Sequence, residues 1–256
     1  MSSTSQFVAI RLENHVLFIR LNRGERKNAL SHDMYWTIAD AIAGADQDRE
    51  VRVILIHGSD VCFSSGNDLA NFFNQDPGEY PEALALRFID TLLNARKPII
   101  AAVAGVAVGI GATMLLHCDL VFAADNSRFK LPFTQLGLVP EAASSLLLPR
   151  LCGHQKAMEL LLLGESFDAE TAVEIGLVNA ISHESVVAHG KAVALRLAKL
   201  PPQAVQATKR LLREPLRSAI REAHDREQQY YIDALDSAEV AEALAAFMEK
   251  REARFD

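Results

Sequence analysis

Residues 98–116 read PIIAAVAGVAVGIGATMLL and carry no charged side chain. By length and polarity alone, this stretch could cross a membrane as a helix. It is rich in alanine rather than leucine, however, and three glycines interrupt it: Gly105, Gly109 and Gly111. A buried parallel strand at 99–103, a glycine turn and a buried helix at 112–116 explain the stretch better. We therefore expect no membrane span.

The sequence on both sides repeats this alternation of strand and helix. Apolar runs predict strands at 7–13, 15–21, 51–57 and 119–124. Helical periodicity predicts one helix from its N-cap Ser31 to about Gly44 and another over 81–95. The alternation ends near Ile181, and a helical tail follows it. Further helix starts are expected at Asp168, at Pro201-Pro202 and at Ser237. The predicted fold class is α/β.

Composition limits the classes of function. The 256 residues are 50% hydrophobic and 23% charged, which suits one large globular domain with or without an appendage. The formal net charge of -7 argues against a nucleic-acid partner, although a few local Lys or Arg side chains can still hold phosphates. Residues 1–6 lack the pattern of a signal peptide, and the C-terminus lacks a peroxisomal address. We therefore expect a cytoplasmic protein.

The cysteines argue against a disulfide framework and a metal site. Cys62, Cys118 and Cys152 are odd in number and widely spaced. This pattern is typical of reduced thiols in a reducing compartment. No cluster of Cys and His offers ligands for zinc, so no metal site is expected.

Two glycine-containing segments predict exposed backbone amides. In residues 63–69 (FSSGNDL), Gly66 permits a sharp turn that can aim the Asn67 amide outward. Residues 105–113 (GVAVGIGAT) predict a glycine-flexible helix start, whose amides favour a negative oxygen. They are not a dinucleotide fingerprint, because position 114 is methionine rather than glycine. Two such amides that converge from separate loops would form an oxyanion hole.

A third segment, residues 138–145 (LVPEAASS), places Glu141 directly after a proline and among apolar residues. One interpretation is a first-turn glutamate that the helix dipole stabilises. The other is a catalytic base whose pKa is raised by its apolar neighbours. The segment alone leaves both interpretations open.

In this order and at these spacings, the three segments resemble the crotonase (enoyl-CoA hydratase/isomerase) superfamily. Shorter matches extend the resemblance over nearly the whole chain: RKNAL at 26–30, KPIIAAV at 97–103, CDLV at 118–121, GLVN at 176–179, and Phe247 with Lys250-Arg251. The resemblance implies a crotonase-like ββα superhelix over 1–194, which binds an acyl-CoA, and a helical C-terminal oligomerisation region over 195–256. It also implies a homotrimer or a hexamer made of two trimers. Coenzyme A would be part of the substrate, and no separate cofactor is implied.

The same resemblance assigns the site residues. Glu141 is implied as the catalytic base. The backbone amides of Asn67 and Ile110 are implied as donors to the thioester oxygen, so the side chain of Asn67 should be dispensable. The positions implied in binding and covering the CoA moiety are Lys27, Ala29, Ser65, Gly66, Asp68, Leu69, Phe247 and Lys250.

Two positions separate this chain from the hydratases of the superfamily, which activate water with two glutamates. Those positions correspond here to Thr113 and Phe133, and neither side chain can serve as a base. Glu141 instead resembles the base of the Δ3,Δ2-enoyl-CoA isomerases, whose motifs read Ser-Gly-Asn-Asp-Leu and Pro-Glu-x-x-Ser-Ser. We therefore expect an enzyme of fatty-acid β-oxidation or related catabolism that moves the double bond of an unsaturated acyl-CoA from C3 to C2.

Three alternatives stay open. The ring-epoxide isomerases of phenylacetyl-CoA breakdown carry an aspartate where this chain has Glu141. Another superfamily reaction, such as thioester hydrolysis or enoyl-CoA hydration, would use the same carbonyl site. A non-catalytic acyl-CoA-binding protein would use the two amides only to hold the thioester. Turnover of a 3-enoyl-CoA separates catalysis from binding.

Overall fold

The structure is a computed structural model that describes residues 5–68, 82–249 and 251–255. In this part of the chain, the larger sheet has six strands in the order β1-β2-β3-β4-β6-β9. Their bounds are β1 Val8–Glu13, β2 Val16–Leu21, β3 Val53–His57, β4 Ile99–Val103, β6 Leu120–Ala124 and β9 Ala180–Ser182. Only the β1–β2 hairpin of this sheet is antiparallel; the other pairs are parallel. The predicted strands are confirmed.

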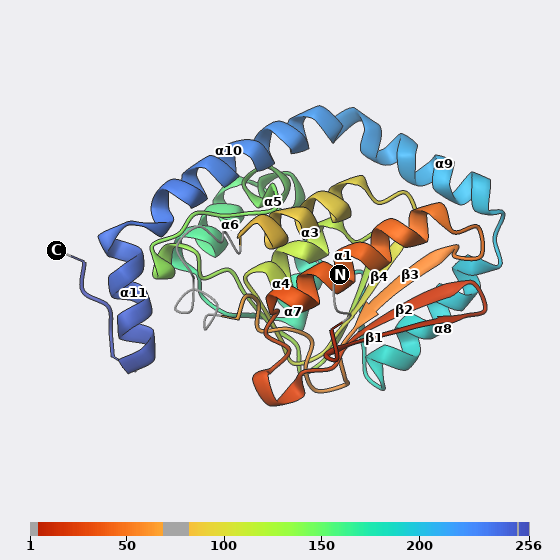
Figure 1. Cartoon of the computed structure of the whole chain (residues 1–256), viewed down its shortest axis with the longest axis horizontal. Coiled ribbons are helices and arrows are strands. Elements are labelled where there is room, and N and C mark those ends of the chain that lie inside the picture. Colours follow the sequence, from red (N-terminus) through yellow and green to blue (C-terminus); the bar gives the residue numbers. More distant parts are fainter. Residues whose placement is uncertain (1–4, 69–81, 250, 256) are drawn as a thin grey trace.

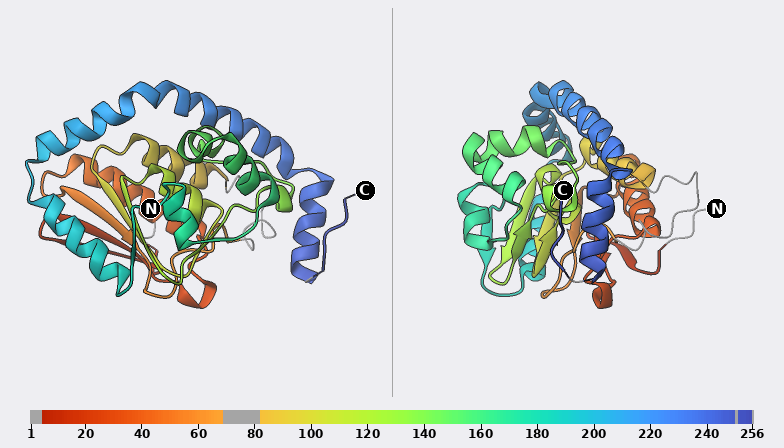
Figure 2. Two further views of the ribbon diagram at one scale, coloured as in Figure 1. Left: turned by 180° about the vertical axis from the view of Figure 1, so that it is seen from behind. Right: turned by 90° about the vertical axis from the view of Figure 1, so that its left-hand side faces the viewer.

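Helices cover both faces of this sheet, which explains why its central strands are apolar throughout. On β3, Ile54 and Ile56 pack into the core beneath α1 (His32–Gln47) and α3 (Glu82–Asn94). Leu55 belongs to a second core with residues of α8 (Val186–Ala198) on the opposite face. Figures 1 and 2 show the resulting layers, with the sheet between α8 and the α1–α3 pair.

A second, three-stranded sheet contains β5 (Val106–Val108), β7 (Arg128–Lys130) and β8 (Phe167–Asp168). The sequence predicted only a glycine turn at 105–111, so β5 is an addition to the prediction. Three residues are too few to produce a detectable period. After β5, α4 (Ile110–Thr113) and the 3₁₀ helix η2 (Met114–His117) form the predicted buried helix.

Shorter elements complete the core. They are η1 Gly24–Arg26, η3 Thr134–Leu136, α5 Ser144–Cys152, α6 His154–Met158, the π-helical η4 Glu159–Leu163 and α7 Ala169–Glu174. Asp168 caps α7 as predicted, because its carboxylate accepts a hydrogen bond from the Thr171 amide (2.9 Å). Ser31 precedes α1 as predicted but does not cap it. Its hydroxyl donates to the nearby carboxylate of Asp33 instead.

The helical tail consists of α9 (Pro202–Arg213), η5 (Glu214–Leu216), α10 (Arg217–Leu235) and α11 (Ala238–Glu249). Figure 1 shows α9 and α10 running across the molecule above α1, α3 and α5. Buried Lys209 ties α9 to the sheet by donating to the Lys97 carbonyl (2.8 Å) and pairing with Asp119 (2.7 Å). The predicted division at 194/195 lies within α8. No helix in the described ranges has the length and apolar character of a membrane span.

Candidate active site

The Asn67 amide lies in a turn that pairs with the loop preceding α1. A parallel bridge joins Leu30 to Asn67. Its hydrogen bonds run from the Leu30 amide to the Gly66 carbonyl (2.8 Å) and from the Asp68 amide to the Leu30 carbonyl (3.1 Å). Because these bonds use the residues on either side of Asn67, the amide of Asn67 itself points away from the loop. It donates to no other residue in the described chain.

Gly66 brings this turn against the start of α4. Its φ is +89°, and a Cβ there would lie 2.4 Å from the Val108 carbonyl oxygen and 3.8 Å from the Ile110 nitrogen. Only glycine fits so close an approach at a positive φ. The amides of Ala112 and Thr113 both donate to the Gly109 carbonyl, whereas the Ile110 amide has no acceptor within the described residues. Two amides without a protein acceptor in the described chain therefore lie on segments in contact, one on the 64–68 turn and one at the start of α4.

Most of the expected CoA-binding positions also come together here. The Ser65 amide donates to the Lys27 carbonyl (2.9 Å). Arg23 joins both loops, because its guanidinium pairs with Asp68 and donates to the Ala29 carbonyl. Lys27 has an exposed side chain, which leaves it available to a phosphate.

Of the other three positions, the structure describes only Phe247. Leu69 and Lys250 lie outside the described residues. Phe247 is on α11, where its side chain is 59% exposed. It is not one of the residues that line the cavity described next.

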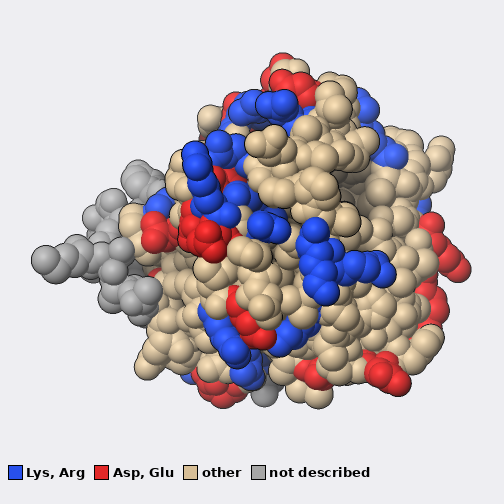
Figure 3. All heavy atoms as spheres, turned by 90° about the vertical axis from the view of Figure 1, so that its right-hand side faces the viewer, with Lys and Arg blue, Asp and Glu red and all other residues tan. Residues whose placement is uncertain are grey.

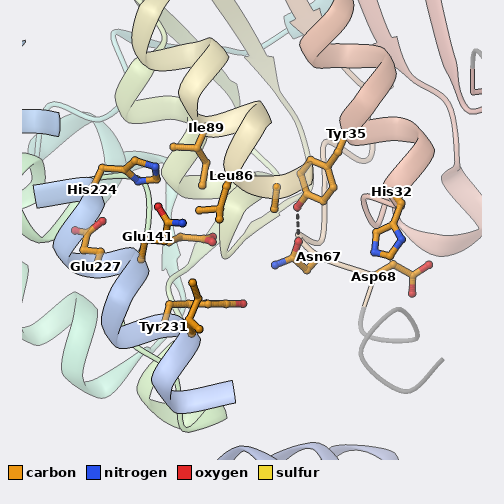
Figure 4. Close-up of a pocket in the computed structure, with 13 residues that line it drawn as sticks. His32, Tyr35, Asn67, Asp68, Leu86, Ile89, Glu141, His224, Glu227 and Tyr231 are labelled. Atoms are coloured by element: carbon orange, nitrogen blue, oxygen red, sulfur yellow. Dashed lines mark hydrogen bonds between the residues drawn. The ribbon is translucent and has the colours of Figure 1, made fainter. Parts of the chain in front are cut away.

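A mostly apolar cavity opens beside the Asn67 turn (Figure 4). Its walls come from α1, the 64–68 turn, α3, the Glu141 segment and α10. The lining residues are His32, Tyr35, Asn67, Asp68, Ala85, Leu86, Ile89, Glu141, His224, Glu227, Gln228, Tyr231 and Ile232. The Tyr35 hydroxyl donates to the side-chain oxygen of Asn67. Neither Tyr35 nor the α10 residues were predicted to lie at the site, because helical periodicity indicates which face of a helix is buried but not which residues it packs against.

Glu141 projects into this cavity, and Figure 4 shows its carboxylate directed toward Tyr35 and Asn67. Burial, followed by the nearby carboxylate of Glu227, raises the pKa of Glu141 to about 8. Burial also raises the pKa of the Tyr35 hydroxyl well above its usual value, with Glu141 as the next cause. Glu141 is therefore a carboxyl group that can both accept and release a proton near neutral pH.

Neither hydratase position contributes a polar group to the cavity. Thr113 is fully buried, and its hydroxyl donates to the Gly109 carbonyl (3.3 Å). Phe133 is buried in the main core. The second carboxylate beside Glu141 is Glu227 from the helical tail, a residue that the sequence did not indicate. Within the described ranges, no group of His, Cys, Asp and Glu side chains could hold a metal ion.

The surface is not uniformly acidic despite the net charge. Figure 3 shows Lys and Arg side chains gathered on one end of the molecule, interspersed with Asp and Glu. The overall charge of -7 therefore leaves room for local positive sites that can bind phosphate.

The chain is similar to known proteins over nearly its whole length. A family model described as enoyl-CoA hydratase/isomerase matches residues 11–256. A 1,2-epoxyphenylacetyl-CoA isomerase of Escherichia coli (strain K12) is 32% identical over 258 residues, which cover 98% of each chain. A peroxisomal enoyl-CoA delta isomerase 3 of Mus musculus is 33% identical, covering 94% of this chain and 74% of that protein. The solved structure of Pseudomonas aeruginosa OdaA matches with a TM-score of 0.91 and 46% identity, covering 95% and 99% of the two chains. The predicted crotonase-like fold is confirmed.

Proposed function

The chain belongs to the enoyl-CoA hydratase/isomerase family and is an enzyme of that family. From that premise we propose that it moves the double bond of an unsaturated acyl-CoA from C3 to C2. The observation that carries the proposal is one proton-exchanging carboxyl group, Glu141, in an apolar cavity beside the Asn67 turn. The residues at the two hydratase positions, Thr113 and Phe133, have no carboxylate.

The carbonyl of the thioester is held first. Its oxygen accepts hydrogen bonds from the amides of Asn67 and Ile110, which have no protein acceptor in the described chain. Negative charge develops on this oxygen when the C2 proton leaves, so preorganised donors stabilise the dienolate more than the substrate. Gly66 and its left-handed backbone keep the two loops in contact.

The proton is then transferred by one group. The Glu141 carboxylate takes the C2 proton, the pair of the broken C2–H bond forms a C1–C2 double bond, and the carbonyl pair moves onto the thioester oxygen. The same group then returns the proton at C4: the carbonyl re-forms, the C1–C2 pair shifts to C2–C3, and the C3–C4 pair forms the new C4–H bond. The atoms balance without water or a redox partner, so the reaction needs no separate cofactor. A single carboxyl suffices because it gives back what it removes.

The CoA moiety is assigned to the surface beside the two loops. Lys27, Ala29, Ser65, Gly66 and Asp68 would form the channel for its pantetheine and phosphates. Hydrogen bonds between the two loops and the ion pair of Arg23 with Asp68 support this assignment. Leu69, Phe247 and Lys250 are proposed only from the resemblance.

Isomerisation of a ring epoxide of phenylacetyl-CoA is the second candidate. Identity to the Escherichia coli epoxyphenylacetyl-CoA isomerase extends over 98% of both chains and supports it. A single acid–base carboxyl beside a thioester pocket suits both substrates. The polarity of the cavity favours an acyl chain, because Leu86, Ile89 and Ile232 supply apolar walls.

The test is a panel of 3-enoyl-, 2-enoyl- and ring-epoxide-CoA thioesters assayed with wild type and Glu141→Gln. We expect turnover of 3-enoyl-CoA, seen as new absorbance of the conjugated thioester. The Gln variant, which retains size and loses the base, should lower kcat by roughly 10²–10⁴-fold with little change in binding. Wild-type turnover of the epoxide alone would select the second candidate. If the protein binds the thioesters but converts none of them, the result would support a non-catalytic acyl-CoA-binding protein.

A further inference from the structure

The residues that follow Glu141 adopt an unusual backbone conformation. Ala142 and Ala143 both have left-handed dihedral angles, with φ values of 59° and 56°. This region is unfavourable for a residue with a Cβ, and two consecutive alanines in it require support from their surroundings. The direction of the Glu141 side chain depends on this turn, because the turn connects Glu141 to α5.

Glu227 of α10 provides that support. One carboxylate oxygen accepts a hydrogen bond from the Ala143 amide (2.6 Å), and the other accepts one from the Ser145 amide (2.8 Å). Glu227 is only 6% exposed, so water does not compete for these bonds. From the other side, His117 Nε2 donates to the carbonyl of Ala142 (2.7 Å). The peptide unit between Ala142 and Ala143 is thereby fixed at both its carbonyl and its N–H by side chains distant in sequence.

Burial and hydrogen bonding act in opposite directions on the charge of Glu227. Burial is the larger effect and raises its pKa to about 7, although the hydrogen bonds from Ser145 and Ala143 favour the ionised form. Both oxygens of Glu227 are engaged with backbone amides, so we assign it a supporting role rather than that of a second base. Its negative charge adds to burial in raising the pKa of Glu141.

Other titratable groups also face the pair, and the two buried histidines among them carry little opposing charge. Burial lowers the pKa of His117 to about 4 and lowers that of His224, so both are neutral near pH 7. In the described part of the chain, the remaining groups around the cavity or acting on Glu227 are His32, Tyr35, Asp68, Arg226 and Tyr231.

We propose that Glu227 is a positioning residue for Glu141: its carboxylate fixes the turn that carries the base, and its negative charge favours uptake of the substrate proton by Glu141. The proposal rests on Glu141 as the base, whichever acyl-CoA is the substrate. It gives the helical tail a role in catalysis that is independent of any contact with another subunit.

The decisive variant is Glu227→Gln. The amide retains the side-chain volume but loses the charge, and only its oxygen can accept an N–H bond. We expect kcat to fall roughly 10- to 100-fold with KM nearly unchanged, because the base is displaced. Glu222→Gln is the matched control, since Glu222 is an exposed residue of the same helix and undergoes the same chemical change. It should behave as wild type.

The Glu141 titration provides a readout independent of turnover. Carbon-13 NMR of the glutamate carboxyls, assigned by comparison with Glu141→Gln, should show a midpoint near pH 8 in wild type. In Glu227→Gln that midpoint should fall below the wild-type value, because the repelling charge is gone while the burial of Glu141 remains. An unchanged midpoint in a folded variant overturns the proposal even when the wild type is an active isomerase. A lowered midpoint upholds it even when no 3-enoyl-CoA is turned over, which then refutes only the proposed substrate.

A rescue variant separates positioning from general destabilisation. Ala143→Gly, added to Glu227→Gln, removes the cost of the left-handed conformation that Glu227 normally offsets. The double variant should recover much of kcat while its Glu141 midpoint stays low. If Glu227→Gln alone does not fold, the titration of Glu141 can be measured in the double variant instead. No recovery of kcat in the folded double variant would contradict the positioning role.

Discussion

The hydroxyl of Tyr35 donates a hydrogen bond to the side chain of Asn67, the residue whose backbone amide we assign to the oxyanion hole. Tyr35 is 2% exposed and belongs to α1, whereas Asn67 belongs to the turn beside the cavity. The sequence predicted that only the amide of Asn67 matters. The structure adds that its side chain connects the turn to a helix of the core.

Asn67→Ala should therefore retain most activity but lose stability. The amide that binds the thioester remains, while the buried Tyr35 hydroxyl loses its partner at a cost of about 1–3 kcal/mol. Adding Tyr35→Phe removes that unpaired hydroxyl, so the double variant should be more stable than Asn67→Ala alone. Urea unfolding of the two single variants and the double variant measures the coupling. Simple additivity would mean that the hydrogen bond is unimportant.

The pH dependence of activity should report the raised pKa of Glu141. A base must be ionised to take a proton, so kcat/KM with 3-enoyl-CoA should rise as the pH increases through about 8. Stopped assays between pH 5 and 10, with buffers of matched ionic strength, would measure the curve. A plateau already reached at about pH 5.5, as for an ordinary glutamate, would contradict the assignment.

Glu141→Gln should stabilise the protein at alkaline pH. The pKa of Glu141 is raised from its ordinary 4.5 to about 8 in the folded state, so the native protein binds this proton more tightly than the unfolded chain. Its contribution to wild-type stability is therefore lost as the pH rises from about 4.5 to about 8. The Gln variant lacks this loss, so at pH 9 its free energy of unfolding should exceed that of the wild type by at least about 1 kcal/mol. Denaturant unfolding at pH 5 and pH 9 provides the comparison.

Hydration of crotonyl-CoA should be slow or absent. Thr113 is buried and bonded to its own helix, and Phe133 cannot accept a proton, so water at the hydratase position has no base. The absorbance of crotonyl-CoA should remain nearly constant over a time in which 3-enoyl-CoA is converted. A hydration rate equal to the isomerisation rate would rule out the proposed function.

The tail should also form a subunit contact. Leu211 and Leu212 on α9 are 73% and 75% exposed, although large apolar side chains usually have a partner. We expect light scattering to give the mass of a trimer or hexamer. Replacing both leucines with lysine should shift that mass toward the monomer. A wild-type protein that is monomeric and fully active would contradict the predicted interface.

The features that could be predicted from the sequence are those encoded by short stretches of neighbouring residues. The apolar runs of β3 and β4 indicate a sheet covered on both faces, and Gly66 and Gly109 indicate backbone that other residues adopt poorly. Both glycines have positive φ and flank the unpaired amides. The local segment marked Glu141 only as an acid after a proline among apolar residues, and its assignment as the base came from the resemblance to the Δ3,Δ2-enoyl-CoA isomerases.

The remaining features depend on contacts between distant residues. Glu227 and the Ala143 amide that it binds are 84 positions apart, and nothing in the charged α10 sequence distinguishes Glu227 from its exposed neighbours. The turn at 142–143 could not be predicted either, because alanine rarely adopts a positive φ and nothing in the sequence indicates one there. The contribution of α10 to the cavity wall could not be predicted either, because it depends on how that helix packs over α3 and α5.

Because α10 lies near the C-terminus, the chain can fold its sheet before its catalytic cavity is complete. Ribosomes would complete the sheet and Glu141 long before they synthesise Glu227 and Tyr231, which complete the cavity. A nascent or truncated chain could therefore possess an ordered core and yet be inert. Heating should reveal the same hierarchy, because detachment of α9 and α10, held to the sheet by Lys209, abolishes turnover while the strands remain protected from hydrogen exchange.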